Sequence, residues 1–443
     1  MRLKTPFKRS WPALTATQSC KKLSVRILFL TNFYPPYQVG GQEQSCQQVV
    51  EGLKQRGHAT LVLTSMYGTN NTPKEVGGIS RSLYLEMDLV PWRHSLTFFT
   101  QRKRREKHNL QELERVLEAF APDIVFIWGM WNLPRSLPAH AEAKCPGKVV
   151  YRFAEYWPTL PSQHELYWRA PGRTWYSQLV KRALRHIALA QLRKGNGQQT
   201  TLQLAQAMCV SAATRTILVE AGIPVSNARI VHTGLDVNQF PNGGRHPSGA
   251  EDHTLRLLYA GRLTADKGVD TVITAMAHLV SDRRLRCISL AIAGSGSTDY
   301  QNYLRLMVTQ AGMTDYVSFL GPVPYAEMPR LLQKFDVLLV PSIWPEPFAR
   351  VILEGMISGL AVVATPTGGT GEIIVDDDNG LLFRPGNAED LARKIMRLVV
   401  DPGLRQRLAQ AGQQTVRQRF TMPKMLAEIE SYLQEVAWLS TNR

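Results

Sequence analysis

Two glutamates eight positions apart, Glu346 and Glu354, are suited to binding a ligand with hydroxyl groups at both ends. Glu346 lies in a proline-rich loop, and the apolar spacing from Val351 onward predicts a helix just beyond it. Glu354 would lie roughly 9 Å along that helix, at about 1.5 Å per residue. A sugar ring and a ribose are similarly separated across a pyrophosphate, so the pair suits a nucleotide sugar.

The start of the same helix would add backbone donors to the site. The N–H groups of about Phe348 to Arg350, beside Pro347 and Ala349, would have no partner inside the helix and would face anionic or hydroxyl oxygens. For isolated glutamates the commoner arrangement is a solvated surface whose charge complements the helix dipole. The neighbouring residues decide between the two interpretations.

The whole stretch resembles the Glu-x7-Glu signature of the family 4 retaining glycosyltransferases. In that family the first Glu contacts the donor sugar and the second contacts the nucleotide ribose, which implies these roles for Glu346 and Glu354. Two positions depart from the pattern, because Ala349 replaces a usual Gly and Gly355 a usual Ala. The matching residues are the Pro-Ser at 341–342, the Glu-Pro-Phe at 346–348, the run AVVATP, Gly368 and Gly369.

A second cluster, Gly261-Arg262 followed by Lys267-Gly268, comes directly after the apolar run LRLLYA. One guanidinium and one ammonium near a helix start can stabilise a nucleoside diphosphate leaving group without a metal ion. As a lone pair, such cations would usually be a surface feature. The cluster looks like the diphosphate loop of the family, which implies a donor-binding role for Gly261, Arg262 and Lys267.

The loop with Gly40 and Gly41 follows the first apolar run of the chain. Two residues without side chains let the backbone approach the donor phosphate or the acceptor. A tight turn that needs positive φ is the alternative. We favour the ligand site, because parallel sheets bind ligands at the carboxyl ends of their strands. In similar proteins this loop closes over the reacting centre.

Ala154 and Glu155 stand at a strand end where family members commonly carry a His-Asp pair. The hydrogen bond usually made by that His is therefore absent, or is supplied by Glu155 or by His164. Glu155 could equally be a structural carboxylate that pairs with Arg152. The sequence leaves both interpretations open.

Several other patterns are set aside. The Gly294-x-Gly296 pair lacks the third glycine of a dinucleotide fingerprint, so we expect no nicotinamide cofactor. The acidic triplet 376–378 precedes Asn-Gly and predicts an exposed turn, not a divalent-metal site. The five cysteines are scattered singly, which favours a reducing compartment and argues against a zinc site. We expect no metal and no cofactor, and a donor substrate of the UDP or GDP type.

Short Val/Ile/Leu-rich runs alternate with helical stretches in both halves, which predicts parallel strands joined by crossover helices. The predicted class is α/β, with two Rossmann-like doubly wound domains; the resemblance implies that they face a cleft (GT-B). We expect a basic disordered arm over 1–23, an acceptor-binding domain over 24–237 and a donor-binding domain over 238–422. The resemblance also implies that the last helix, within 423–443, crosses back onto the first domain.

The net charge of +16 lies entirely in the first half of the chain. Residues 1–240 contain 31 Lys and Arg against 15 Asp and Glu, whereas the remainder contains 21 of each. Such a half suits an anionic substrate or membrane surface, and no nucleic-acid-binding motif is recognisable. The longest apolar run is about half of what a bilayer crossing requires. We expect a cytoplasmic protein, with peripheral binding to the inner membrane face as one option.

The segment 175–194 predicts a helix with an apolar and a basic face. Its apolar positions include Trp175, Leu179, Leu184, Ile187 and Leu192, and its basic positions include Lys181, Arg182, Arg185, Arg193 and Lys194. In one interpretation it covers a Rossmann domain with the basic face in water. In the other, the first domain binds anionic membranes weakly and reversibly with salt.

Together these residues predict a retaining glycosyltransferase that moves a hexose from a nucleoside-diphosphate sugar to a hydroxyl of a glycan or lipid-linked acceptor. The mechanism implied by the resemblance is a metal-free front-side displacement. The alternatives are a nucleotide-sugar epimerase or phosphorylase of the same fold, and an idle nucleotide-sugar-binding protein that lacks the usual His.

Overall fold

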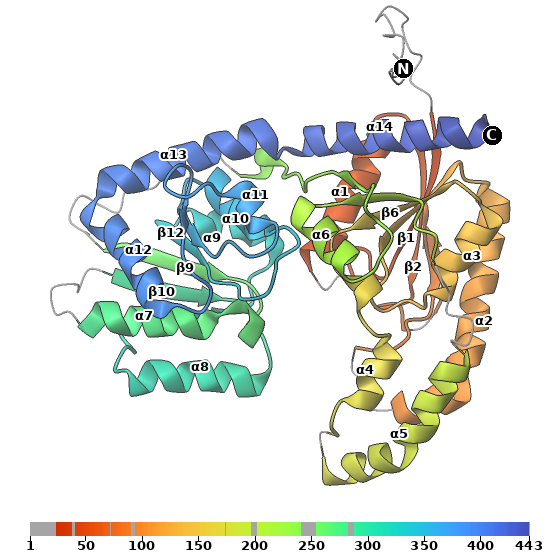
Figure 1. The fold of residues 1–443 in the computed structure, drawn as a ribbon, viewed down its shortest axis with the longest axis horizontal. Helices are drawn as coiled ribbons and strands as arrows, with labels where there is room; N and C mark the ends of the chain where they lie inside the picture. Colours follow the sequence, from red (N-terminus) through yellow and green to blue (C-terminus); the bar gives the residue numbers. More distant parts are fainter. Residues whose placement is uncertain are drawn as a thin grey trace, which may run out of the picture.

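The computed structural model describes residues 24–37, 40–70, 72–89, 94–172, 174–195, 202–240, 254–281 and 288–442. Within them the chain forms two α/β domains, each built on one largely parallel sheet (Figure 1). The predicted fold class, two Rossmann-like doubly wound domains, is confirmed. The predicted basic arm over 1–23 and the segment 241–253 between the domains lie outside the described residues.

The sheet of the first domain has the strand order β3-β4-β2-β1-β5-β6-β7-β8. Its strands pair in parallel except for the edge strand β3, which runs antiparallel to β4. The sequence did not predict this edge hairpin, since β3 is short and fully exposed. The strands are β1 (Arg26–Thr31), β2 (Ala59–Ser65), β3 (Lys74–Val76), β4 (Ile79–Leu83), β5 (Ile124–Gly129), β6 (Val149–Phe153), β7 (Gln206–Cys209) and β8 (Arg229–Ile230).

The sheet of the second domain has the order β11-β10-β9-β12-β13-β14, and its strands pair in parallel. Strand order reverses between β9 and β12, which is where a doubly wound sheet opens to a ligand. The strands are β9 (Leu255–Ala260), β10 (Ile288–Ala293), β11 (Val317–Gly321), β12 (Val337–Val340), β13 (Ala361–Ala364) and β14 (Leu381–Leu382).

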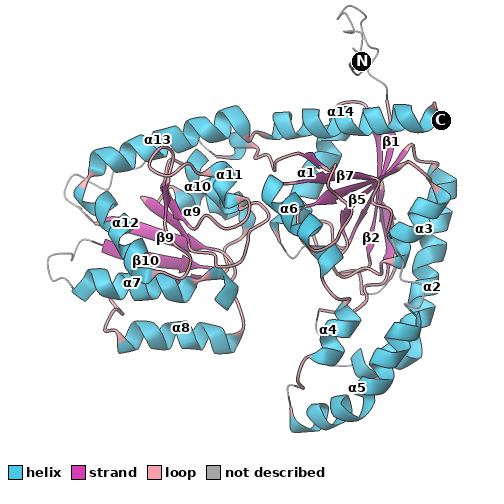
Figure 2. Ribbon diagram, viewed as in Figure 1, coloured by secondary structure: helices cyan, strands magenta, loops and turns pink. Residues whose placement is uncertain are grey.

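Helices cover both faces of each sheet (Figure 2). Those of the first domain are α1 (Gly41–Gln55), α2 (His94–Phe120), α3 (Ser136–Lys144), α4 (Gln163–Arg169), α5 (Trp175–Gly195) and α6 (Ala212–Glu220), with η1 (Trp157–Thr159) and η2 (Val237–Gln239). Those of the second are α7 (Val269–Ser281), α8 (Thr298–Gln310), α9 (Met328–Leu332), α10 (Arg350–Ile357), α11 (Thr370–Ile373), α12 (Ala388–Val400) and α13 (Pro402–Arg419), with η3 (Ala265–Lys267) and η4 (Tyr325–Glu327).

Most strands are largely apolar because both of their faces are buried, whereas the edge pair β3 and β4 carries polar residues. In β1, Leu28 and Leu30 enter one core while Ile27 and Phe29 enter the core on the opposite face. Alternate residues of the strand therefore enter two different cores, instead of one core and the solvent. This explains why continuous apolar runs, without polar interruption, located most of the strands.

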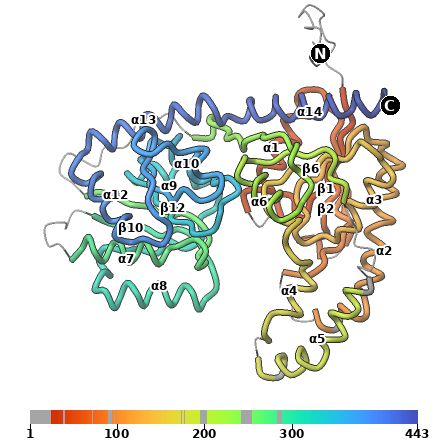
Figure 3. Tube along the Cα trace, in the orientation of Figure 1, coloured from red at the N-terminus to blue at the C-terminus, as the bar shows by residue number. Residues whose placement is uncertain are grey.

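The last helix, α14 (Met422–Thr441), leaves the second domain and packs on the first (Figure 3). Its apolar side joins the core beside α1, and Glu430 forms ion pairs with Arg56 at 2.5 Å and with His58 at 3.1 Å. The helix residues in this core are Met422, Met425, Leu426, Ile429, Tyr432, Leu433, Val436 and Ala437.

Helix α5 does not cover the sheet, so that interpretation of segment 175–194 is wrong. It packs against α4 and the start of α2 around Phe98 and Trp168, and the three helices project from the first domain (Figure 1). Trp175, Leu179 and Ile187 are 77%, 58% and 53% exposed. Leu184 and Leu192 pack in this small core, and Lys181 of the predicted basic face is buried as well, so helical periodicity predicted the two faces only in part. The exposed apolar residues have no covering element among the described residues.

Candidate active site

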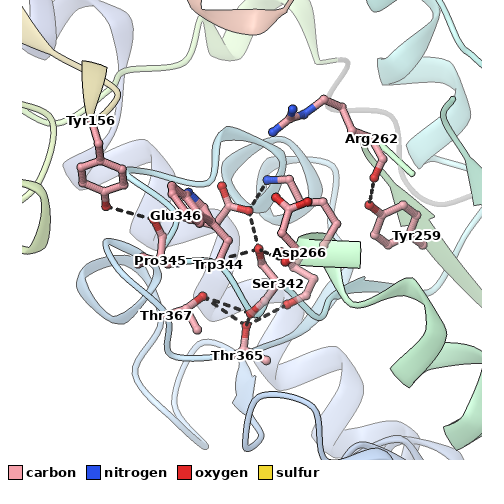
Figure 4. A network of polar contacts seen from close by, with 12 residues as sticks. Tyr156, Tyr259, Arg262, Asp266, Ser342, Trp344, Pro345, Glu346, Thr365 and Thr367 are labelled. Atoms are coloured by element: carbon pink, nitrogen blue, oxygen red, sulfur yellow. Dashed lines mark hydrogen bonds and ion pairs between the residues drawn. The ribbon is translucent and has the colours of Figure 1, made fainter. Parts of the chain in front are cut away.

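Glu346 lies in the loop after β12, within a polar network that fixes its carboxylate (Figure 4). The Ser342 hydroxyl donates a hydrogen bond to Oε1 of Glu346 at 2.7 Å, and the Lys267 ammonium forms an ion pair with the same oxygen. Thr365 in turn donates to the Ser342 carbonyl at 2.6 Å. Lys267 and Glu346 are 79 positions apart and belong to different motifs. The sequence assigned both to one site, and the structure brings them into contact.

Glycines allow the loops around Glu346 to pack closely. Gly368 has φ +56°, and a Cβ there would lie 2.2 Å from the Glu346 carbonyl oxygen. The next N–H, of Gly369, donates to that oxygen at 2.7 Å. Gly268 has φ +64° and a Cβ there would lie 2.2 Å from the Pro341 carbonyl oxygen. Both positions combine left-handed backbone with no room for a side chain, which only glycine tolerates.

Arg262 lies in the neighbouring loop after β9. The Tyr259 hydroxyl donates to its carbonyl at 2.6 Å, and its guanidinium points towards Glu346 (Figure 4). This guanidinium forms no ion pair with any described residue. A Cβ at Gly294 would lie 1.8 Å from the Gly261 carbonyl, so the Gly294-x-Gly296 pair brings two loops together and has a packing role.

Glu354 lies on α10 and is buried. Nε of Arg350 approaches its Oε1 at 3.0 Å, and the Tyr325 hydroxyl contacts the Arg350 guanidinium. Burial raises the pKa of Glu354, while Arg350 opposes that shift. Sequence reasoning missed Arg350 and Tyr325 as side-chain partners. The i,i+4 spacing from Arg350 to Glu354 was a usable signal, whereas nothing near Tyr325 pointed to the site.

Arg350 also connects the two domains. Its guanidinium lies 3.4 Å from the Gly41 carbonyl and 3.4 Å from Oε1 of Gln48, both on α1. Gly41 begins α1, and Gly40 has φ −156°, which is ordinary extended backbone. The alternative of a positive-φ turn at Gly40 is therefore wrong. The glycine loop of the first domain faces the start of α10, where Pro347, Phe348 and Ala349 precede the helix.

Glu155 lies beyond β6, close to the start of α1. Its Oε1 is buried without a hydrogen-bond partner among the described residues, while the Gln42 side chain and the Met130 backbone contact the carboxyl. Burial, reinforced by the negative charge of Glu43, raises the pKa of Glu155 to about 8. At neutral pH this carboxyl is largely protonated and can donate a hydrogen bond.

Two sequence alternatives for this position are wrong. Arg152 does not pair with Glu155, because its guanidinium donates to the Val231 carbonyl at 3.1 Å and lies 5.0 Å from the Trp128 ring centroid. His164 does not belong to the Glu346 network. Its ring stacks on that of His94, with Nδ1 3.2 Å from Nε2 of His94.

The first domain touches the donor loop directly. The Tyr156 hydroxyl donates to the Pro345 carbonyl at 2.9 Å, and the Ser211 hydroxyl donates to the Pro347 carbonyl at 2.7 Å. These bonds hold both sides of Glu346 against the first domain. The position of the Glu346 carboxylate therefore depends on how the two domains are arranged.

A second contact between the domains is ionic. Glu372 on α11 accepts hydrogen bonds from the N–H groups of Ala212 and Ala213, at 3.1 and 2.9 Å, and lies 3.0 Å from Nε2 of His232. Burial alone would raise the pKa of Glu372, but the bonds from His232 and the two N–H groups hold it below its ordinary value. The carboxylate is thus ionised when it caps α6.

The acidic triplet 376–378 forms the exposed turn that was predicted. Asp377 has φ +64° and pairs with Arg397 at 2.5 Å, while Asp376 pairs with Lys394 at 3.1 Å. Within the described ranges, no three His, Cys, Asp or Glu residues gather closely enough to hold a metal ion.

The two facing α/β domains, with charged loops at the strand ends, define a GT-B protein. Residues 245–415 match the model of the glycosyl transferases group 1 family, and residues 39–239 match that of glycosyltransferase family 4. The chain belongs to the family 4 glycosyltransferases, as the sequence resemblance indicated.

Related sequences carry glycosyltransferase names. An uncharacterised glycosyltransferase of Methanocaldococcus jannaschii is 29% identical over 46% of this chain and 53% of its own length. Glycogen synthase of Mycobacterium tuberculosis is 28% identical over 48% and 49%. D-inositol 3-phosphate glycosyltransferase of Corynebacterium aurimucosum is 28% identical over 62% and 68%. The chain spans about half the length of the first of these relatives.

Solved structures share the whole fold. Sucrose-phosphate synthase from Thermosynechococcus elongatus has a TM-score of 0.68 at 18% identity, over 93% of this chain and 99% of that chain. Anabaena HepE in complex with UDP-glucose has a TM-score of 0.64 at 21% identity, over 93% and 100%. At such identities the likeness concerns the fold. Among the described helices, none combines the length and the hydropathy needed to cross a bilayer.

Proposed function

We propose that this protein is a retaining glycosyltransferase that moves a hexose from a nucleoside-diphosphate sugar to a hydroxyl of a glycan or lipid-linked acceptor. The observation that carries this proposal is the ion pair between Lys267 and Glu346, towards which the Arg262 guanidinium points (Figure 4). One carboxylate for sugar hydroxyls beside two cations for a diphosphate is the set of groups that such a donor requires.

In the proposed reaction the diphosphate of the donor draws Lys267 away from its ion pair. Glu346 is then free to accept hydrogen bonds from the sugar, and Arg262 adds a second positive charge. The bond from the sugar carbon to the phosphate oxygen breaks as the bond to the acceptor oxygen forms on the same face. The acceptor proton passes to the departing phosphate, whose growing charge the two cations stabilise.

The other predicted residues take positioning roles in this scheme. Glu354, held by Arg350, would bind the ribose hydroxyls. Gly40 and Gly41 would place the start of α1 beside the reacting centre. Glu155, protonated at neutral pH, would donate the hydrogen bond that a His provides in other family members.

For the donor we propose the UDP type first, with the GDP type as the alternative. Solved structures of Anabaena HepE hold UDP and UDP-glucose in the same overall fold, which supports this choice. Metal-free action is also a proposal, based on the two cations available at the diphosphate position.

The first experiment measures the melting temperature with UDP-, GDP- and ADP-linked hexoses. A donor at 100 times its Kd should stabilise the protein by about 2.7 kcal/mol. Transfer is then followed with the donor that stabilises, with and without EDTA. Stabilisation by none of them would overturn the proposal. Conversion to an epimer, phosphate-dependent release of the sugar, or binding without turnover would favour the respective alternatives.

We also propose that α5 brings the first domain to anionic membranes. Trp175, Leu179 and Ile187 are exposed, and so are Arg182 and Arg185 on the same helix. Each basic residue near an anionic leaflet contributes roughly 1 kcal/mol, reduced by salt. Sedimentation with anionic and neutral vesicles tests this. Equal binding to both kinds of vesicle, or binding to neither, would reject the proposal that α5 brings the first domain to anionic membranes.

A further inference from the structure

The first domain contains a cavity of about 860 Å³ that is separate from the Glu346 network. All of its lining residues belong to the first domain. They come from α2, the start of α3, η1, α4 and the end of α5, and from the loops after β4, before β7 and after α6. Pockets for small molecules commonly have volumes of about 300–1,000 Å³. The cavity is therefore large enough for a ligand of its own.

One wall of the cavity carries two half-buried arginines with few anionic contacts. Nε of Arg105 is buried and finds no hydrogen-bond partner among the described residues, while its Nη1 forms a long ion pair with Asp88 at 4.0 Å. Arg102, one turn earlier on α2, lies 5.3 Å from the Phe98 ring centroid and forms no ion pair with a described residue. An anion beside these guanidinium groups would form charge-assisted hydrogen bonds, so this wall favours an anionic ligand.

The neighbouring titratable groups do not cancel this charge. Burial raises the pKa of Glu86 to about 7, so its carboxyl is only partly ionised at neutral pH. Burial lowers the pKa of His94 to about 4 and that of His164 to about 3, so both rings are neutral. Glu106 accepts a hydrogen bond from Ser136 at 2.7 Å, and Glu165 pairs with Arg169 at 2.5 Å.

Part of the lining is apolar. Phe98 and Leu192 are buried side chains of the small core between α2, α4 and α5, and Leu204 and Ile223 belong to the main core. A ligand that fills the cavity must therefore combine an anionic head with an apolar body. A free sugar phosphate would leave the apolar part unfilled.

The position of the cavity relates it to the reacting centre. Trp157 lines it and directly follows Tyr156, whose hydroxyl bonds to Pro345 beside Glu346. Leu192 lines it from α5, the helix that exposes Trp175 and Ile187. The cavity is thus one residue away from the contact with the donor loop, and it is lined in part by the helix proposed to bind membranes.

We infer that this cavity binds an amphiphilic phosphate, with the phosphate at Arg102 and Arg105 and an alkyl chain along Phe98, Leu192 and Leu204. The inference rests on the proposed function in one respect, since it identifies this ligand as the anchor of a lipid-linked acceptor. The phosphate binding itself follows from the cavity alone.

The test is calorimetric titration of the whole protein with decyl phosphate below its critical micelle concentration, without donor. Inorganic phosphate, glucose 6-phosphate and decyl glucoside are titrated in parallel. Decyl phosphate should bind most tightly, and R102Q/R105Q should raise its Kd by at least about tenfold through loss of charge-assisted hydrogen bonds. The matched control K103Q/R104Q changes two exposed cations of the same helix and should leave the Kd unchanged.

Each outcome has a defined meaning. An equal loss of affinity for decyl phosphate in both double variants would attribute binding to the overall positive charge of α2. If glucose 6-phosphate or inorganic phosphate binds most tightly, the ligand is a free phosphate and not an amphiphile. No binding of decyl phosphate would overturn the inference.

If R102Q/R105Q melts at a lower temperature than the control, I223D tests the apolar part independently. Transfer activity without decyl phosphate binding would remove this inference alone, and binding without transfer would remove only the proposed function.

Discussion

At the scale of single residues, both glutamates of the signature are already paired before any ligand binds. Lys267 occupies Oε1 of Glu346, and Arg350 occupies Oε1 of Glu354. These pairs limit the cost of burying the carboxylates, and Tyr325 adds a further contact to Glu354. A donor therefore exchanges existing contacts instead of creating all of them.

Removing either member of the donor site should strongly reduce transfer. We expect Lys267→Ala and Glu354→Ala each to lower kcat/KM by at least about a hundredfold, the order of loss for one preorganised charged contact. Lys334→Ala, which changes an exposed lysine of the same domain, is the control and should leave the rate unchanged. Near-normal turnover by either folded site variant would reject the assigned roles.

The raised pKa of Glu155 predicts a specific pH profile. The neutral carboxyl is the form that donates a hydrogen bond, and it is lost as the pH rises through about 8. We expect kcat/KM to fall above this pH in the natural protein, and the fall to disappear in Glu155→Gln, which keeps a neutral donor. Glu155→Ala should be slow at every pH. An identical alkaline limb in the Gln variant would assign the titration to another group.

The residue scale also shows how far the sequence could lead. The motif predicted Glu346, Glu354, Arg262 and Lys267, and the structure brings Lys267 and Glu346 into contact. The sequence could not decide the surroundings of Glu155. The burial of this carboxyl beside Glu43 brings together chain segments more than a hundred residues apart. The structure excludes pairing with Arg152, whereas a role in catalysis stays a prediction.

At the scale of elements, the site consists of loops held together by glycines. Strands β9, β10, β12 and β13 end side by side, and the loops after them touch backbone to backbone at Gly268, Gly294 and Gly368. The sequence located most strands because buried parallel strands are continuously apolar. It missed the β3–β4 hairpin, whose outer strand is exposed. It also offered α5 as a cover of the sheet, because helical periodicity does not identify which element packs against a helix face.

A single methyl group at Gly368 should displace the Glu346 loop. Gly368→Ala places a side chain at φ +56° and 2.2 Å from the Glu346 carbonyl, and a strained residue of this kind costs about 1–3 kcal/mol. We expect a lower melting temperature and weaker donor binding. Gly371→Ala is the matched control three residues away, because a Cβ there meets nothing within 4 Å. Equal effects of the two substitutions would contradict this packing argument.

At the scale of the whole molecule, the domains are joined in two ways. The chain passes between them twice, and these passages lie together, since Leu235 N–H donates to the Phe420 carbonyl at 2.9 Å and Met422 N–H donates to the Leu235 carbonyl at 2.8 Å. The contacts of Glu372 and of the donor loop lie away from this pair. The paired passages can act as a hinge, while the other contacts hold the closed arrangement.

Breaking the ionic contact should favour an open arrangement. We expect Glu372→Ala to increase the radius of gyration in small-angle scattering and to raise the donor KM more than it lowers kcat, because the N–H groups of Ala212 and Ala213 lose their acceptor. The pKa of Glu372 lies below its ordinary value. The natural protein should therefore open in the same way only when the pH falls below the pKa of an ordinary carboxyl. Glu389→Ala, at an exposed site on α12, should change neither quantity.

The return of α14 to the first domain also has a consequence for synthesis. Domains usually fold one after another as the chain leaves the ribosome. Here eight residues of α14 complete the core around β1, so the first domain stays open along one side until the second domain and α14 have been translated. During that time its apolar strands remain accessible to chaperones and to other nascent chains. A message truncated before the codons of α14 would therefore leave the core of the first domain unfinished, although every one of its strands had been made.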